Sequence, residues 1–225
     1  MAKPGPARQA GGVRTGYRDR RAAGEELSAH LAHYAGRPDV TVLGLVRGGV
    51  PVAAVVAARL AAPLDVLVVR KLGVPGAEEV AFGALGPGGV MVRNQEIAAR
   101  VPAELIAWVR QREEAELARR ERLYRAGRPA LDLTGRTAIV VDDGLATGAT
   151  ARAAVAVARG LGAAWVVLAT PVAAPDALGL VRAAADEVVC PLAPPQFGAV
   201  SRYYDRFGQV SDDEVVGLLA GAGQR

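Results

Sequence analysis

The fold of this chain is decided by the stretch Ile139-Val140-Val141-Asp142-Asp143-Gly144-Leu145-Ala146-Thr147-Gly148-Ala149-Thr150. Residues 138–141 form a short apolar run with β-branched side chains, which is typical of a buried strand. Two adjacent carboxylates follow at the expected strand end, and a loop with glycines and threonines comes next. Residues 147–161 then show helical periodicity, with an apolar face formed by Ala151, Ala154, Val155, Ala158 and Leu161.

A strand, a Gly/Thr loop and a helix N-terminus in this order predict an anion site. Backbone N–H groups point into such a loop, and the helix dipole favours negative charge there. A phosphate alone does not need two adjacent carboxylates, but the hydroxyls of a sugar that carries the phosphate would use them as acceptors. The alternative is an ordinary strand-to-helix turn with an Asx-type cap and no ligand.

The same stretch resembles the phosphoribosyl pyrophosphate (PRPP) motif of the type I phosphoribosyltransferases. The resemblance runs without a gap through Val-Val-Asp-Asp-Gly-Leu-Ala-Thr-Gly-Ala-Thr. It implies that the two acids face the ribose 2′- and 3′-hydroxyls and that the loop wraps the 5′-phosphate. The PRPP-binding residues that it implies here are Asp142, Asp143, Gly144, Leu145, Ala146, Thr147, Gly148, Ala149 and Thr150.

A second loop, Arg47-Gly48-Gly49, separates a predicted strand (residues 40–46) from a helix that we expect to start at Pro51 and run to about Leu60. It resembles the family loop that holds the pyrophosphate of PRPP, often through a non-proline cis peptide. The alternative is a turn with an exposed arginine.

Arg70 and Lys71 follow a predicted strand at residues 66–69. They resemble the Arg-Lys-x-Gly segment of adenine-type phosphoribosyltransferases, which implies that Lys71 points at the pyrophosphate. The alternative is a solvated basic pair at a strand end.

Alternating strands and helices predict an α/β fold with a doubly wound, mostly parallel sheet, and the resemblance implies the type I phosphoribosyltransferase fold. A first helix is expected at residues 18–35, and later elements at 164–170, 176–184 and 186–190. The predicted organisation is a disordered basic tail (1–16), a core (17–190) with a hairpin and helical insertion (74–128), and a C-terminal hood segment (191–225).

The insertion is expected to hold a hairpin around Gly86-Pro87-Gly88, with strands at 80–85 and 89–92, and a short helix at 94–100. A longer helix is expected over 102–126. Its middle is charged nearly all round, so the sequence predicts an exposed protruding arm. In the family this region carries a mobile loop that closes over the active site.

The hood segment is rich in aromatic residues. A flat acceptor could stack on Phe197 or Tyr203, although these rings could equally pack the tail onto the sheet. Ser211 and Glu214 have the spacing of a capping box and predict a last helix that runs to Ala220.

Composition excludes several classes of protein. The net charge is +4, with basic residues concentrated at 3–21 and 110–128, but each of these segments holds only one aromatic residue, so nucleic acid is not the expected partner. A single cysteine, Cys190, allows no internal disulfide and fits a reducing, cytoplasmic compartment. No apolar run reaches the roughly 18 residues of a membrane span. His30 and His33 share a helix face, but no third metal ligand is evident.

The resemblance implies Mg²⁺-dependent transfer of 5-phosphoribosyl from PRPP to an acceptor nitrogen, on a nucleobase or related heterocycle, with release of pyrophosphate. The expected catalytic residues are Asp142, Asp143, Lys71 and Arg47, with Mg²⁺ carried by PRPP and possible contact to Asp142 through water. Family members are commonly dimers, so a homodimer is expected.

Two other functions stay open at this point. One is a PRPP-sensing regulator that binds without catalysis and contacts nucleic acid, and the other is an enzyme whose acceptor is not a nucleobase. The chain also resembles a little-characterised bacterial phosphoribosyltransferase-like group, for which no acceptor is implied. That resemblance rests on residues 45–51, 69–73, 127–129 and 196–197.

Overall fold

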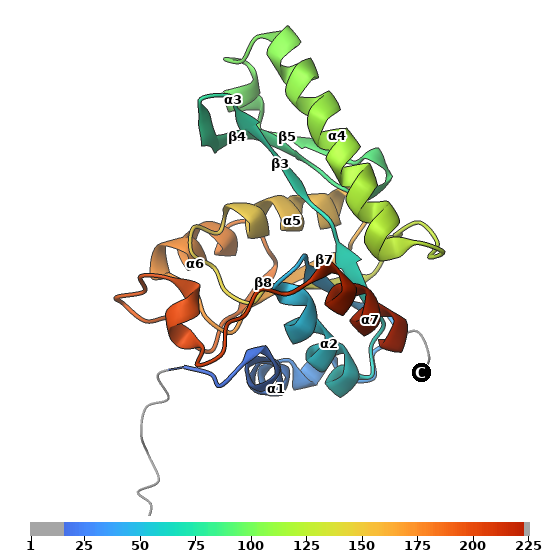
Figure 1. The fold of residues 1–225 in the computed structure, drawn as a ribbon, viewed down its shortest axis with the longest axis vertical. Coiled ribbons are helices and arrows are strands. Elements are labelled where there is room, and N and C mark those ends of the chain that lie inside the picture. Colours follow the sequence, from blue (N-terminus) through green and yellow to red (C-terminus); the bar gives the residue numbers. More distant parts are fainter. Residues whose placement is uncertain (1–15, 223–225) are drawn as a thin grey trace, which may run out of the picture.

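The computed structural model describes residues 16–222 and is built on a five-stranded parallel sheet (Figure 1). The strand order is β2-β1-β6-β7-β8, and every neighbouring pair is parallel. This confirms the predicted α/β class with its parallel sheet. The strands are β1 (Val40–Leu45), β2 (Leu64–Leu67), β6 (Thr137–Val141), β7 (Trp165–Ala169) and β8 (Glu187–Val189).

Helices cover both faces of this sheet because successive strand residues point to opposite sides. In β6, Ile139 and Val141 belong to the core cluster under α1, α2 and α7, whereas Ala138 and Val140 belong to the cluster under α5 and α6. Both faces are therefore apolar, as expected for a parallel sheet. The helices are α1 (Arg20–His30), α2 (Gly49–Leu60), α5 (Ala149–Gly160), α6 (Pro175–Arg182) and α7 (Asp212–Ala222).

Three helices begin or end away from their predicted positions. Asp19 caps α1 by accepting the N–H of Ala22, and the helix ends at His30, where a 3₁₀ helix (Ala32–Tyr34) follows. Helix α2 begins at Gly49 rather than Pro51. Helix α5 begins at Ala149 rather than at 147, because Gly148 adopts a left-handed conformation with φ of 72°.

Residues 70–128 form an insertion lobe between β2 and β6, drawn above the main sheet in Figure 1. The predicted hairpin is present as β4 (Ala77–Leu85) and β5 (Met91–Arg93), joined through a 3₁₀ helix (Pro87–Gly89). A third antiparallel strand, β3 (Arg70–Val74), pairs with β4. The helices of the lobe are α3 (Gln95–Ala98) and α4 (Ala103–Arg125).

Strand β3 corrects the prediction for residues 66–71. The parallel strand is β2 and ends at Leu67, so Arg70 and Lys71 do not terminate it. They start an antiparallel strand that turns back at Gly76, whose φ is 81°. The sequence pattern missed this strand because only Leu72 of its residues is buried.

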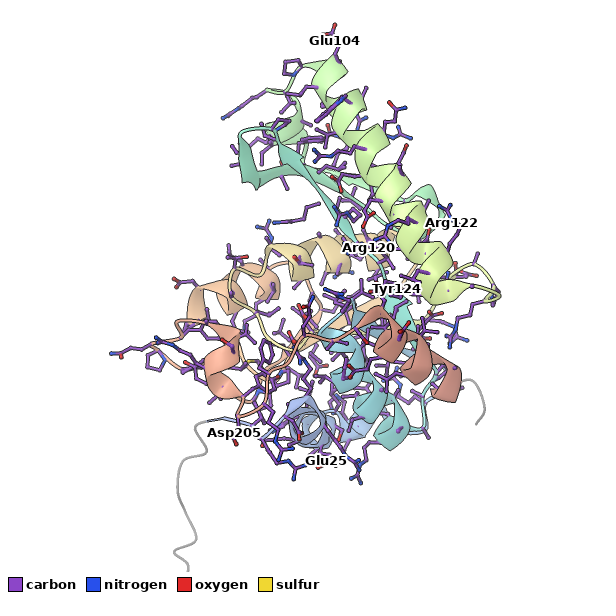
Figure 2. The ribbon with its side chains drawn as sticks, viewed as in Figure 1. Glu25, Glu104, Arg120, Arg122, Tyr124 and Asp205 are labelled. Atoms are coloured by element: carbon purple, nitrogen blue, oxygen red, sulfur yellow. The ribbon has the colours of Figure 1, made fainter. Side chains whose placement is uncertain are left out.

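Helix α4 packs along one side against the small sheet. The sequence predicted an exposed protruding arm, because the middle of the helix is charged nearly all round, and the structure corrects this for the packed side. Val109 and Leu117 are buried in the core cluster that also holds Leu72 and Phe82 of the small sheet. Figure 2 places Tyr124 at the end of α4 nearest α7, and its hydroxyl donates to Asp212 at 2.5 Å. Within α4, Arg119 and Arg120 both bind Glu116.

The hood segment packs against the start of the described chain. Tyr17 forms a parallel bridge with Tyr204, and its hydroxyl donates to the carbonyl of Pro171 at 2.9 Å. A small core forms around these contacts, separate from the two clusters of the main sheet. Ser211 accepts the N–H of Glu214 at 3.1 Å at the start of α7, as the capping pattern predicts. The members of the small core are Tyr17, Ala23, Val172, Phe197 and Tyr204.

The predicted disordered tail, except for Gly16, lies outside the described residues, as do 223–225 of the predicted hood. Among the residues from 16 to 222, no helix combines the length and apolar character needed to cross a membrane.

Candidate active site

The loops that follow β1 and β6 meet at the carboxyl edge of the sheet. A Cβ atom on Gly49 would collide with the carbonyl oxygen of Val141 and would lie 2.9 Å from Cα of Asp142. A Cβ atom on Gly48 would collide with the carboxylate of Asp143, with only 2.7 Å to its Cγ. The two glycines are therefore needed for the loops to touch, which joins the Arg47-Gly48-Gly49 loop and the paired acids into one site.

Arg47 follows a cis peptide bond, the bond from Val46. A cis bond before a residue other than proline is rare, and it is the feature that the resemblance implied for this loop. The guanidinium of Arg47 is partly exposed, and its Nη1 lies 3.6 Å from a carboxylate oxygen of Asp212 at the start of α7. A cation on a partly open loop can reach an anionic ligand without a change of fold.

The two acids at the end of β6 lie in different surroundings. Asp142 accepts the N–H of Asp143 through Oδ1 at 2.9 Å, and burial together with the neighbouring negative charge raises its pKa above the usual range. Burial also raises the pKa of Asp143, against the opposing effect of Arg20, whose Nε donates to Oδ2 at 2.8 Å. Both carboxyl groups can accept hydroxyls of a ligand when ionised.

Neither acid caps α5, so the structure does not have the Asx-type cap of the alternative interpretation. The N-cap position is Gly148, which has no side chain to accept a bond from the first turn. Thr147 accepts the N–H of Ala149 at 3.4 Å, and Ala146, Thr147 and Thr150 are exposed. The loop thus presents hydroxyls and the N-terminus of α5 on the side where an anion would bind.

Arg70 and Lys71 of β3, which were predicted to bind pyrophosphate, have different neighbours from each other. Arg70 donates from Nε to Glu113 of α4 at 2.7 Å, so its guanidinium holds the insertion lobe together. Lys71 is half-buried and lies opposite Ala84 in the ladder with β4. The structure therefore brings Arg47, Gly48 and Gly49 to the paired acids, and it places Arg70 in a contact with α4.

A cavity of about 440 Å³ opens beside Asp143. Its walls come from α1, the Arg47-Gly48 loop, the β6 loop and the end of the hood. Neither Phe197 nor Tyr203 is part of its lining, and the aromatic ring that does line it is that of Phe207. The lining residues are Arg20, Arg47, Gly48, Asp143, Phe207, Gly208, Gln209 and Val210.

Phe197 and Tyr203 instead pack on each other within the hood. Their ring centroids are 5.4 Å apart with an interplanar angle of 26°, and Phe197 is buried. The hydroxyl of Tyr203 donates to the carbonyl of Phe197 at 2.9 Å. This geometry favours the interpretation in which both rings pack the hood, and their role as acceptor-binding residues stays a prediction.

Arg20 is the site residue that the sequence did not indicate. It is the first residue of α1, and its side chain is only 13% exposed. It lies in the basic segment 3–21 among other arginines, and nothing local distinguishes it from them. Only the fold brings it to Asp143, 123 residues further along the chain.

Known proteins resemble this chain over most of its length. The family model described as phosphoribosyl transferase domain matches residues 17–206. Two curated proteins of Mycobacterium tuberculosis, from strains CDC 1551 and H37Rv, are each 51% identical over 203 residues, and their names assign them provisionally to the phosphoribosyl transferases. The match covers 89% of this chain but 46% of each relative, so the chain spans about half their length.

A solved structure, TT1426 from Thermus thermophilus, is similar throughout. It is 42% identical, and the match covers 91% of this chain and 98% of that one with a TM-score of 0.84. The fold, including the insertion lobe and hood, is thus one that a related chain also adopts.

Proposed function

Because this chain belongs to the phosphoribosyl transferase domain family, we propose that it transfers the 5-phosphoribosyl group of PRPP to an acceptor nitrogen and releases pyrophosphate. The observation that carries the proposal is the contact between the paired acids and the Arg47-Gly48-Gly49 loop. The paired acids suit the hydroxyls of a sugar, and the Arg47-Gly48-Gly49 loop suits a pyrophosphate. In PRPP the ribose and the pyrophosphate are joined at C1′.

In the proposed reaction the bond between C1′ and the pyrophosphate oxygen breaks, and the bonding electrons leave with pyrophosphate. The acceptor nitrogen supplies the electron pair of the new bond to C1′. The ribose gains positive charge as the leaving group departs. Asp142 and Asp143 would position the ribose through its hydroxyls and lie near this charge, while Arg47 would stabilise the charge on pyrophosphate.

The 5′-phosphate would bind at the β6–α5 loop. Exposed Thr147 and Thr150 offer hydroxyl groups, and the left-handed Gly148 allows the backbone to turn tightly before α5. The N-terminus of α5 adds its dipole and N–H groups. This anchor would hold one end of PRPP while the Arg47 loop holds the other.

Mg²⁺ fits the same site as a partner of the substrate. Within residues 16–222 there is no group of three or more His, Cys, Asp or Glu side chains that could hold a metal by itself. Mg²⁺ often binds through one or two carboxylates together with substrate phosphates, and Asp142 and Asp143 provide carboxylates beside the proposed phosphate positions. The ion would neutralise charge on the departing pyrophosphate.

The acceptor would enter beside the hood. The cavity near Asp143 is lined on its hood side by the ring of Phe207 and by Gln209, whose amide can both donate and accept hydrogen bonds. This lining suits a flat heterocycle with hydrogen-bonding edges, such as a nucleobase. A homodimer, which the family resemblance implies, belongs to the same proposal, and sedimentation of the purified protein would test it.

Calorimetric titration with PRPP, with and without Mg²⁺, tests the binding half of this proposal. A panel of nucleobases and related heterocycles, assayed for PRPP-dependent release of pyrophosphate, tests the chemical half. We expect Mg²⁺-dependent binding and release with one class of acceptor. Absence of PRPP binding would refute the proposal, whereas tight binding without release from any acceptor would favour the non-catalytic regulator.

A further inference from the structure

Arg20 connects three parts of the candidate site. Its Nε donates to Oδ2 of Asp143 at 2.8 Å, and its Nη1 donates to the carbonyl of Gly208 at 2.8 Å. The centre of its guanidinium lies 4.0 Å from the centroid of the Phe207 ring, in the geometry of a cation–π contact. One side chain on α1 is thus bound to a motif acid and to the end of the hood.

Asp143 is held from several directions as a result. Its Oδ2 bonds to Arg20, its carboxylate lies against the backbone of Gly48, and its carbonyl accepts the hydroxyl of Tyr204 at 2.6 Å. Without these contacts the side chain of Asp143 would sample several rotamers. Because Arg20 binds Oδ2, the orientation of the carboxylate is set, and its remaining lone pairs can accept a ligand hydroxyl.

We propose that Arg20 is a positioning residue, which orients Asp143 for the ribose hydroxyls and fixes residues 207–208 of the hood to the same carboxylate. The proposal rests on the phosphoribosyl transfer proposed above. It assigns Arg20 to the ribose half of PRPP and not to the pyrophosphate half, although its charge alone would suit either.

The geometry favours this assignment over direct phosphate binding. Two of the nitrogens of Arg20 are engaged by oxygen acceptors, one face of its guanidinium lies on Phe207, and the side chain is largely buried. Arg47 is more exposed, and its ion pair with Asp212 is longer, at 3.6 Å. Arg47 is therefore the cation of this cavity that is better placed to contact a phosphate.

The experiment separates the two halves of the substrate. Ribose 5-phosphate and magnesium pyrophosphate are titrated individually, by calorimetry, into the wild type, Arg20→Met and Arg20→Lys. For Arg20→Met we expect roughly tenfold weaker binding of ribose 5-phosphate, because the hydroxyl acceptor loses a charge-assisted hydrogen bond that orients it, and pyrophosphate affinity within about twofold of the wild type.

Arg20→Lys should fall between the other two proteins, because an ammonium can reach Asp143 but has no planar fork with which to bind Gly208 as well. Arg21→Met is the matched control. Arg21 is the next residue of α1, its side chain is 77% exposed and it binds Glu25, so its loss should leave both affinities unchanged.

Three results would overturn the assignment: unchanged binding of both ligands by Arg20→Met, equal losses for both, or a selective loss of pyrophosphate. If Arg20→Met does not fold, Arg20→Lys decides by the same criteria. Failure of the proposed function would look different, because the wild type itself would then bind neither PRPP nor ribose 5-phosphate.

Discussion

Replacing Gly49 by alanine should destabilise the whole protein. The new Cβ atom would lie 2.9 Å from Cα of Asp142, about 1 Å inside an ordinary contact between carbon atoms, and it would be closer still to the carbonyl oxygen of Val141. Both obstacles are backbone atoms at the end of β6, so no side-chain rotation can relieve the collision. The loop of β1 or the end of β6 must move.

The size of the effect follows from two opposing contributions. Overpacking a tight contact costs about 1–3 kcal/mol, and this contact should lie at the upper end because only backbone can yield. Alanine in place of glycine within α2 returns at most about 1 kcal/mol of helix propensity. The net loss of about 2 kcal/mol corresponds to a fall in melting temperature of roughly 4–8 °C for a domain of this size.

Differential scanning calorimetry of Gly49→Ala beside Gly179→Ala measures this effect. Gly179 is an exposed residue of α6, and a Cβ atom there would meet nothing within 4 Å. The same chemical change should therefore leave stability unchanged or raise it slightly. Equal melting temperatures for Gly49→Ala and the wild type would refute the inference that the two loops are in contact.

Three further outcomes are expected. Arg125→Met should lower the free energy of unfolding by about 3 kcal/mol, measured with urea, because it leaves the largely buried Asp65 without its bidentate partner, whereas the exposed Arg122→Met should have little effect. Gly144→Ala should lower the melting temperature by displacing Val200 of the hood, and adding Val200→Ala should recover part of the loss. Asp142→Asn should abolish PRPP binding in calorimetry yet raise the melting temperature at pH 7.

The sign of that last shift follows from the pKa of Asp142. Burial raises the pKa of the folded carboxyl, so its neutral form stabilises the fold at low pH and this stability is lost as pH rises through the folded pKa. Asparagine should therefore stabilise the protein at pH 7 by about 1 kcal/mol or more, and this advantage should disappear near pH 3, below the ordinary aspartate value of about 3.9. An equal advantage at both pH values would contradict the assignment.

Much of the main sheet could be predicted because its signals are local. Residues 138–141 are continuously apolar, and the acids and glycines after them are contiguous in sequence. Strand β3 gave no such signal because it packs only Leu72 into the core and alternates with charged and small residues. Helix α4 looked exposed because two charged residues on its buried side, Glu113 and Arg125, find partners in distant segments that the helical pattern cannot show.

In the candidate site, too, the residues with a local sequence signal could be predicted and the others could not. The paired acids and the Arg47-Gly48-Gly49 loop were recognised from their own residues. Arg20 was not, because its role depends on a contact with Asp143, which lies 123 residues away in the sequence. The acceptor side is the least predictable, since aromatic composition does not tell which ring faces a cavity: Phe207 does, while Phe197 packs into the hood.

The hydrogen bond between Tyr17 and Pro171, which spans 154 residues, has a consequence for how the molecule assembles on the ribosome. The β1–α2–β2 unit can form from residues that emerge together. The contacts of Tyr17 with Pro171 and with the hood cannot form until those later residues have emerged as well. These contacts can form only after the strands of the sheet have emerged, and their small core is separate from the clusters of the main sheet, so it can open locally. Amide hydrogens of Tyr17 and Tyr204 should therefore exchange faster than those of β1 and β6, and the hood side of the candidate site would form after the β1 and β6 loops during synthesis.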